Sequence, residues 1–161
     1  MGSGIKFHKI CGISDPLAPV FNLFAEAYLD EIGESELGEG SVEETLLLQK
    51  EPKRWLLIAE VEGEYAGFVH AKIDTEERPG WGYVIEFYVA PKYRCHGLGH
   101  NMWEAIRVKL AISGVQLIWL SAVKKAEKFW CRQGFVDTGI MEYGEKIFVR
   151  KAYNQKLPSV V

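Results

Sequence analysis

Residues 89–99 read Val-Ala-Pro-Lys-Tyr-Arg-Cys-His-Gly-Leu-Gly, and this stretch joins a predicted strand to a predicted helix. The helix is expected because apolar residues recur at helical spacing at positions 98, 102, 106 and 110. A helix N-terminus offers unpaired N–H groups and partial positive charge, so it binds phosphate readily. Glycine at 97 and 99 lets the backbone approach an anion, and Arg94 can add a charge-assisted contact. The stretch therefore predicts a phosphate-binding loop at the start of a helix.

Two other kinds of phosphate loop are excluded by spacing. A Walker loop needs a lysine and a hydroxyl residue after its last glycine, but His100 and Asn101 follow Gly99. The dinucleotide fingerprint needs a third glycine or an alanine at the position of Met102. Two glycines in a loop are also compatible with a plain tight turn, so the surrounding elements must decide the interpretation.

The elements around the loop predict a βαβ unit. Residues 81–89 are the strand before it, and Gly114 ends the helix after it. Residues 115–120 then form a nearly continuous apolar run, which is typical of a strand buried on both faces, as in a parallel pair. Strand, glycine loop, helix and buried strand together have about the length of such a unit.

Upstream, runs rich in β-forming residues at 55–61 and 65–73 predict a hairpin that continues into residues 81–89 as a meander. Asp15 is the expected N-cap of a first helix, and Ser41 with Glu44 is the expected capping box of a second. The remaining expected elements are strands at 5–11, 135–141 and 146–151 and helices at 16–32, 41–49 and 123–133. The predicted fold class is α/β (α+β), as one domain over residues 1–161.

Composition and charge exclude several classes of protein. Apolar residues make up 48% of the 161 positions and charged residues 25%, as in ordinary globular domains. The formal net charge of −3 and the lack of a Lys/Arg run argue against a nucleic-acid partner. No apolar run has the length of a membrane span, so we expect no membrane partner. Three cysteines without CxxC spacing predict neither a zinc site nor a disulfide framework, and suit a cytoplasmic protein.

Residues 89–99 resemble the signature V-x-P-x-x-R-x-x-G-x-G of the GNAT superfamily of N-acetyltransferases. Residues 59–68, Ala-Glu-Val-Glu-Gly-Glu-Tyr-Ala-Gly-Phe, look like the family's second hairpin. Residues 126–135, Ala-Glu-Lys-Phe-Trp-Cys-Arg-Gln-Gly-Phe, are similar to its A-x-x-F-Y-x-x-x-G-F segment. The resemblance implies a mixed, mostly antiparallel central sheet flanked by helices. It also implies transfer of an acetyl group from acetyl-CoA to a primary amine by direct attack in a ternary complex, without a metal.

The resemblance further implies where acetyl-CoA binds. Its pantetheine would pair like an extra strand with Tyr88 and Val89, where a backbone amide would serve as oxyanion donor. Its pyrophosphate would rest on the loop, for which the implied residues are Arg94, Cys95, His96, Gly97, Leu98, Gly99 and His100. Two positions depart from the family pattern. Val123 replaces the usual asparagine, and Trp130 replaces the tyrosine that often protonates the departing thiolate. An indole N–H cannot supply that proton near neutral pH.

On the amine side, Glu86 is the predicted catalytic base, because an ammonium group must lose a proton before it attacks. Glu86 lies in the otherwise apolar run Val-Ile-Glu-Phe-Tyr at 84–88, although a solvated position on the strand is an equal alternative. His70 is a second candidate base. Tyr83 and Tyr88 are expected on the same strand face as Glu86, where they line a cleft or are ordinary sheet aromatics.

Acidic residues gather between positions 26 and 44, where the family often builds one wall of the acceptor site. Such a wall favours a cationic amine acceptor, whereas a merely solvated helix face is the alternative. A non-catalytic acyl-CoA sensor is the rival function, favoured by Val123 and Trp130. A homodimer through the C-terminal strands is a further family alternative.

Overall fold

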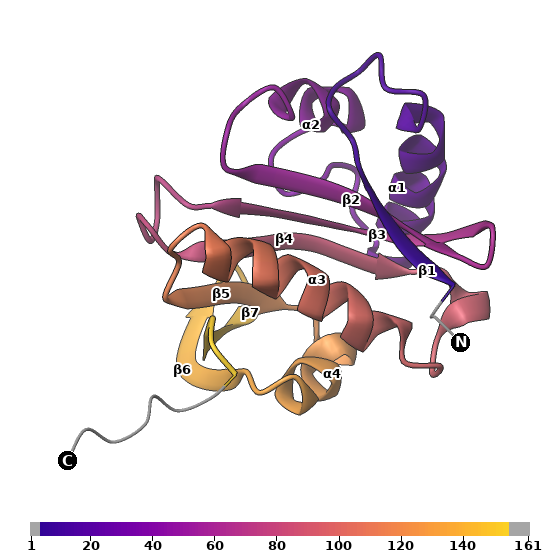
Figure 1. Cartoon of the computed structure of the whole chain (residues 1–161). Coiled ribbons are helices and arrows are strands. Elements are labelled where there is room, and N and C mark those ends of the chain that lie inside the picture. The colour runs from indigo at the N-terminus through magenta and orange to yellow at the C-terminus, as the bar shows by residue number, and fades with distance from the viewer. Residues whose placement is uncertain (1–3, 155–161) are drawn as a thin grey trace.

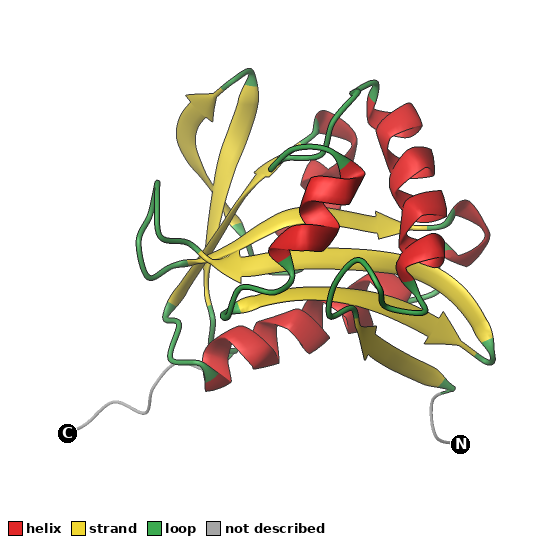
Figure 2. Cartoon of the chain, turned by 90° about the horizontal axis from the view of Figure 1, so that it is seen from above, coloured by secondary structure: helices red, strands yellow, loops and turns green. Residues whose placement is uncertain are grey.

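The computed structural model describes residues 4–154, in which seven strands form one twisted sheet with helices on both faces (Figures 1 and 2). The strands follow the spatial order β1-β2-β3-β4-β5-β7-β6, and only β4 and β5 run parallel. Their bounds are β1 Ile5–Lys9, β2 Arg54–Val61, β3 Glu64–Ile73, β4 Gly82–Val89, β5 Leu117–Ala122, β6 Val136–Glu142 and β7 Glu145–Lys151. The predicted mixed, mostly antiparallel sheet is therefore confirmed.

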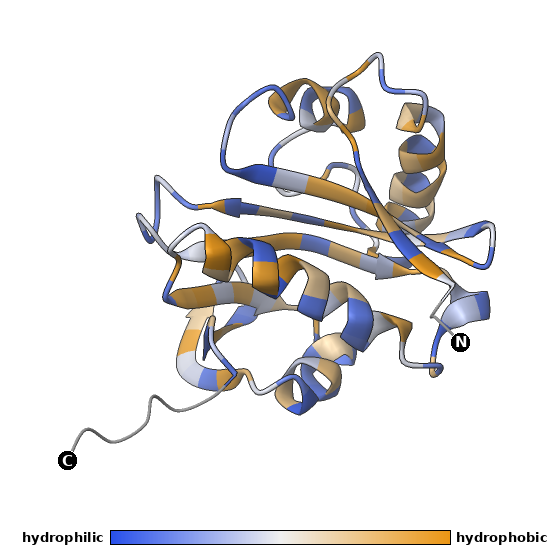
Figure 3. Cartoon of the chain, in the orientation of Figure 1, coloured by the Kyte–Doolittle hydropathy of each residue, from blue (hydrophilic) through white to orange (hydrophobic). Residues whose placement is uncertain are grey.

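Four α-helices cover the sheet: α1 Ala18–Ile32, α2 Val42–Leu48, α3 Leu98–Ile112 and α4 Glu127–Arg132. Helices α1 and α2 lie on one face, and α3 and α4 lie on the other (Figure 1). Figure 3 shows hydrophobic and hydrophilic residues alternating along α1 and α3, as expected for helices with one buried side. No helix within residues 4–154 is long and apolar enough to cross a membrane.

Each face of the sheet has its own apolar core, because successive side chains of a strand point to opposite faces. On β3, Phe68 packs with Phe21 of α1, whereas Val69 packs with Trp103 and Ile106 of α3. Both faces of the central strands are therefore buried under helices.

The element boundaries differ from the expected ones by small shifts with local causes. The first helix begins at Ala18 with Leu17 at its N-cap position, because the Asp15 carboxylate instead accepts from the N–H groups of Leu17 and Cys11. The predicted capping box of α2 is confirmed, with Ser41 and Glu44 bonded reciprocally. The helix expected at 123–133 divides into a 3-10 turn, Lys124–Ala126, and the shorter α4.

Strand β4 has two irregularities that shape the site. Its pairing with β5 is limited to Gly82 with Ile118 and Tyr83 with Trp119, so the rest of β4 has no recorded partner on that side among the described residues. Its register with β3 also shifts by one residue, because His70 pairs with Glu86 whereas Ala71 pairs with Val84. The extra residue, Ile85, forms a β-bulge and reverses the facing of the side chains that follow.

Candidate active site

The loop before α3 leaves room for a ligand at Gly97. Gly97 is the N-cap of α3 with φ of 85°, and no side chain of the described residues caps the first turn. A Cβ built on Gly97 would meet nothing within 4 Å. Cys95 also has a positive φ, 66°, and its side chain is exposed. The backbone N–H groups of this turn are therefore open to an anion, and the phosphate-binding loop stays a prediction.

Gly99 has a different role from Gly97. A Cβ at Gly99 would lie 2.8 Å from Cε1 of the Phe129 ring, which is closer than real Cβ contacts. Helix α4 therefore packs directly against the first turn of α3 only because this position lacks a side chain. The second glycine of the motif serves helix packing.

Arg94 is already occupied by protein partners. Its Nη1 and Nη2 donate to the two oxygens of Glu31 at 2.7 and 2.8 Å, and its Nε donates to the Val89 carbonyl at 2.7 Å. The hydrogen bond from Arg94 holds the pKa of Glu31 below its ordinary value. Arg94 thus ties the C-terminal end of α1 to the end of β4, and contact with a phosphate would require it to release Glu31.

The other predicted cofactor residues lie around the same loop. Tyr88 is buried against α1, and the Arg94 guanidinium lies 5.6 Å from its ring centre. Leu98 is buried and anchors α3 in the core. His100 shares a hydrogen bond of 2.7 Å with Gln133 beside α4. His96 is exposed, so it lies at the surface of the loop.

The structure buries the predicted base, Glu86, which is only 3% exposed. Its Oε1 is 2.8 Å from Nδ1 of His70, and its Oε2 accepts from the Gly38 N–H at 2.7 Å. The two candidate bases, Glu86 and His70, are therefore hydrogen-bonded to each other. The solvated alternative for Glu86 is wrong in this structure, because the turn at residues 37–40 covers the carboxylate.

A buried ionic network surrounds this pair, and the sequence did not reveal it. Arg54 and Lys72, both buried, donate to opposite oxygens of Glu39, and Arg54 also contacts His70 Nε2 at 3.1 Å. Burial alone would raise the pKa of Glu39, but the hydrogen bonds from Lys72 and Arg54 outweigh it and hold that pKa below its ordinary value. The available signal was the period-2 spacing of Phe68, His70 and Lys72, which places them on one strand face.

Two tyrosines lie near Glu86. Burial raises the pKa of both the Tyr28 and Tyr83 phenols, and the Glu86 carboxylate adds to the shift in each. Further carboxylates contribute in the same direction, namely Glu31, Glu39, Asp74, Glu77 and Glu145. Tyr83 stacks on Trp119 with ring centres 4.0 Å apart. Strict alternation places only Tyr88 on the face of Glu86, and the bulge at Ile85 brings Tyr83 to that face as well.

Trp130 does not replace the family tyrosine as an acid. Its ring packs edge-on against Phe87, Trp103, Phe129 and Phe135, with ring centres 4.8 to 6.0 Å apart. Edge-to-face packing of this kind stabilises the core beneath the sheet. Trp130 is therefore a packing residue.

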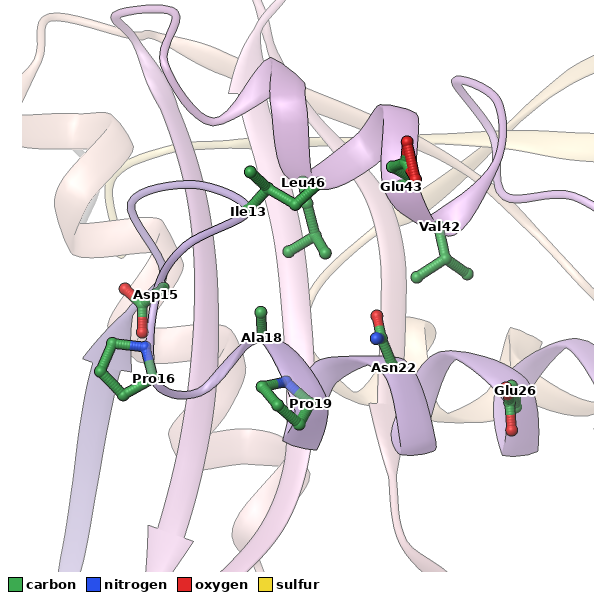
Figure 4. A pocket seen from close by; sticks show the side chains of 10 residues that line it. All are labelled: Ile13, Asp15, Pro16, Ala18, Pro19, Asn22, Glu26, Val42, Glu43 and Leu46. Atoms are coloured by element: carbon green, nitrogen blue, oxygen red, sulfur yellow. The ribbon is translucent and has the colours of Figure 1, made fainter.

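The acidic residues of the N-terminal region are divided among several places. Glu31 and Glu39 are paired with cations, and Glu44 closes the capping box. Glu26 and Glu43 line a pocket of about 510 Å³ between α1 and α2, where Val42 and Leu46 point toward Ala18 and Asn22 (Figure 4). This pocket contains none of the predicted site residues, so the acidic residues do not form the single wall that the sequence suggested.

Comparisons with known proteins match this architecture. A model of the acetyltransferase (GNAT) family matches residues 17–135. An acetyltransferase from Thermus thermophilus is 20% identical, with a TM-score of 0.71 over 92% of this chain and 99% of that one. An aminoglycoside 6'-N-acetyltransferase complexed with coenzyme A is 12% identical, with a TM-score of 0.73 over 94% and 99%.

A third structure, N-acetylglutamate synthase from Neisseria gonorrhoeae complexed with coenzyme A and N-acetyl-glutamate, is 15% identical. Its TM-score is 0.71 over 96% of this chain but only 36% of that one. At such low identities the three structures show a shared fold. No curated protein sequence matches the chain.

Proposed function

This chain belongs to the acetyltransferase (GNAT) family, and from that membership we propose that it transfers an acetyl group from acetyl-CoA to a primary amine. The observation that carries the proposal is the open, Gly97-capped N-terminus of α3 beside the unpaired end of β4. Donors for a pyrophosphate and a free strand edge for a pantetheine chain lie next to each other there. Two of the solved structures that share the fold are complexed with coenzyme A.

The residues present fit acetyl-CoA through their backbone rather than through charged side chains. The turn from Cys95 to His100 presents N–H groups, and Gly97 has no Cβ to obstruct an approaching phosphate. The end of β4 at Tyr88 and Val89 offers backbone groups for a pantetheine chain. When bound, acetyl-CoA supplies an activated acyl group as a thioester, whose thiol has an ordinary pKa of about 8.5.

We propose that Glu86 takes the proton of the attacking amine, directly or through water. Each of its oxygens accepts one protein hydrogen bond, which leaves further lone pairs on the carboxylate. In the reaction the ammonium group first gives one proton to Glu86, and the amine nitrogen then bonds to the acetyl carbon as the carbon–sulfur bond breaks. The second nitrogen proton passes to the departing thiolate or to solvent. The thiolate leaves without Trp130 as its acid, and a general acid contributes roughly 10²–10⁴-fold at most, so the reaction type stands without it.

We propose a cationic amine as the acceptor. The aminoglycoside 6'-N-acetyltransferase that shares the fold has a cationic class of acceptor in its name. Polyamines, aminoglycosides and lysine peptides are the classes to test.

Mass-spectrometric detection of acetylated product from acetyl-CoA and a panel of such amines tests the proposal. We expect one class to be acetylated, with loss of product in Glu86→Gln. A panel without product, together with measurable acetyl-CoA binding, would instead favour the sensor function.

A further inference from the structure

The hydrogen bonds of His70 fix which ring nitrogen carries its proton. Nε2 lies 3.1 Å from Nη1 of Arg54 and 3.2 Å from Nε2 of Gln49. The Gln49 amide nitrogen also donates to the Thr45 carbonyl at 2.9 Å, which fixes the orientation of that amide. Guanidinium and amide nitrogens only donate, so Nε2 of His70 must accept. The ring proton therefore sits on Nδ1 and is donated to Glu86 Oε1 at 2.8 Å.

This arrangement excludes a proton relay through His70. Protonation of Nε2 would remove both of its hydrogen bonds and place a second positive charge against the Arg54 guanidinium, in a fully buried ring. His70 therefore accepts at Nε2 and presents a fixed Nδ1–H to Glu86. The Gly38 N–H holds the other oxygen at 2.7 Å, so the carboxylate is fixed at both ends.

We propose that His70 is a positioning residue for Glu86, held in its tautomer by Arg54 and Gln49. The inference rests on the proposed function, in which Glu86 takes the proton of the amine. Orientation of a base by a second group is a common requirement for its efficiency. Glu39 completes the arrangement, since its carboxylate pairs with both Arg54 and Lys72 and offsets part of the positive charge that lies against His70.

Two isosteric substitutions separate the role of the N–H from that of ring packing. The amide nitrogen of His70→Asn lies near the position of Nδ1 and can still donate to Glu86, whereas His70→Gln places its amide near Nε2. We expect His70→Gln to lower kcat by about 10- to 100-fold, and His70→Asn to recover most of that loss. The KM for acetyl-CoA should change by less than about twofold in both, because the CoA loop is untouched.

The chain offers a matched control in His8, whose Nε2 lies 2.9 Å from Glu60 on the β1–β2 edge of the sheet. His8→Asn, whose amide nitrogen lies near Nδ1 instead of Nε2, removes the hydrogen bond of this histidine–glutamate pair and should leave kcat unchanged. A wild-type kcat in His70→Gln would overturn the inference, as would equal losses in His70→Asn and His70→Gln. A wild-type protein without turnover on the amine panel would instead contradict the proposed function.

A second measurement does not depend on turnover or on how the variants fold. Long-range ¹H–¹⁵N correlation spectra of the ¹⁵N-labelled wild-type protein at neutral pH report the state of each histidine ring. We expect His70, identified by its absence in His70→Asn, to show a protonated Nδ1 and an unprotonated Nε2. The opposite tautomer, or a doubly protonated ring, would overturn the inference.

Discussion

At the residue scale, the two glycines of the loop motif have different roles: Gly97 leaves room for a ligand, and Gly99 allows α4 to pack against α3. Gly97 has a left-handed backbone conformation and open space where a Cβ would be, so a ligand can approach its backbone. Gly99 has an ordinary helical position and the Phe129 ring against it. The two positions should therefore respond differently to substitution, one in binding and the other in stability.

We predict that Gly97→Glu weakens coenzyme A binding by at least about 2 kcal/mol, or roughly 30-fold. The carboxylate would lie where the pyrophosphate is expected, and the two negative charges repel. Gly97→Gln is the control, since it has the same length and the same strain at positive φ without the charge. Calorimetric titration with coenzyme A measures both variants. Equal affinities in a folded Glu and Gln pair would contradict a phosphate at this position.

We predict that Gly99→Ala lowers the free energy of unfolding by about 1–3 kcal/mol, because the new methyl group must displace the Phe129 ring. Thermal or denaturant unfolding measures the loss. The double variant with Phe129→Leu should regain part of it, since leucine leaves more room beside the helix. An unchanged stability in Gly99→Ala would show that α4 does not pack as tightly as described.

The sequence predicts which residues form the loop better than it predicts their partners. Its pattern places Arg94 beside the glycines, but Glu31 lies 63 positions earlier and meets it only after α1 packs on the sheet. The same is true of His70 and Arg54, whose contact depends on the pairing of β2 with β3 and on α2. Periodicity predicts faces of elements, whereas side-chain partners depend on how those elements pack.

At the element scale, the Arg94–Glu31 pair joins α1 to the end of β4. Both side chains are about one-third exposed, so the pair should contribute no more than about 1 kcal/mol. We predict that Glu31→Gln lowers stability by less than this and leaves coenzyme A affinity unchanged. Arg94→Gln should behave in the same way. Titration calorimetry and denaturant unfolding of the two variants provide the check.

A different pair of coenzyme A affinities would indicate that Arg94 binds the pyrophosphate. If the guanidinium leaves Glu31 to bind pyrophosphate, Arg94→Gln should weaken coenzyme A binding, and Glu31→Gln should strengthen it by freeing the arginine. Changes of opposite sign in coenzyme A affinity would therefore contradict a purely structural role for the Arg94–Glu31 pair. They would support the prediction from the sequence that Arg94 contacts the phosphate.

Also at this scale, strand and helix positions were predictable, whereas the bulge in β4 was not. Alternation gave the strands to within a few residues because both faces of the sheet are buried. The register shift at Ile85 leaves no mark in the pattern Tyr-Val-Ile-Glu-Phe-Tyr at 83–88. Since that shift decides whether Tyr83 shares a face with Glu86, the layout of the candidate site could not be obtained from periodicity alone.

At the scale of the whole molecule, the turn at residues 37–40 links the layer formed by helices α1 and α2 to the sheet. Leu37 is buried in the apolar core beneath these helices, and the Gly38 N–H bonds to Glu86. A Cβ at Gly38 would lie 2.8 Å from Ile85 Cγ2, so this position requires glycine. Glu39 then contacts Arg54 on β2 and Lys72 on β3. Glu39 is therefore the ionic link among the contacts that join this layer to the sheet.

We predict that Glu39→Gln lowers the free energy of unfolding at neutral pH by about 3–5 kcal/mol, because it removes the carboxylate that pairs with buried Lys72 and leaves buried Arg54 with only the exposed Glu51. The loss should shrink in acid. The folded-state pKa of Glu39 lies below its ordinary value of 4.5, so its contribution is present above that pH and disappears as the pH falls through the folded-state pKa. The stability curves of wild type and variant should thus converge below about pH 4.5.

Denaturant unfolding at a series of pH values from neutral down to about 3 measures this convergence. Glu36→Gln is the matched control, since Glu36 is an exposed carboxylate of the same connection and should behave like the wild type. A constant gap between wild type and Glu39→Gln down to the acid end of the series would mean that packing, rather than charge, accounts for the loss. In that case the Arg54 cation would depend on a carboxylate other than Glu39, and Glu51, whose Oε1 lies 3.3 Å from Arg54 Nη2, is the one that contacts it.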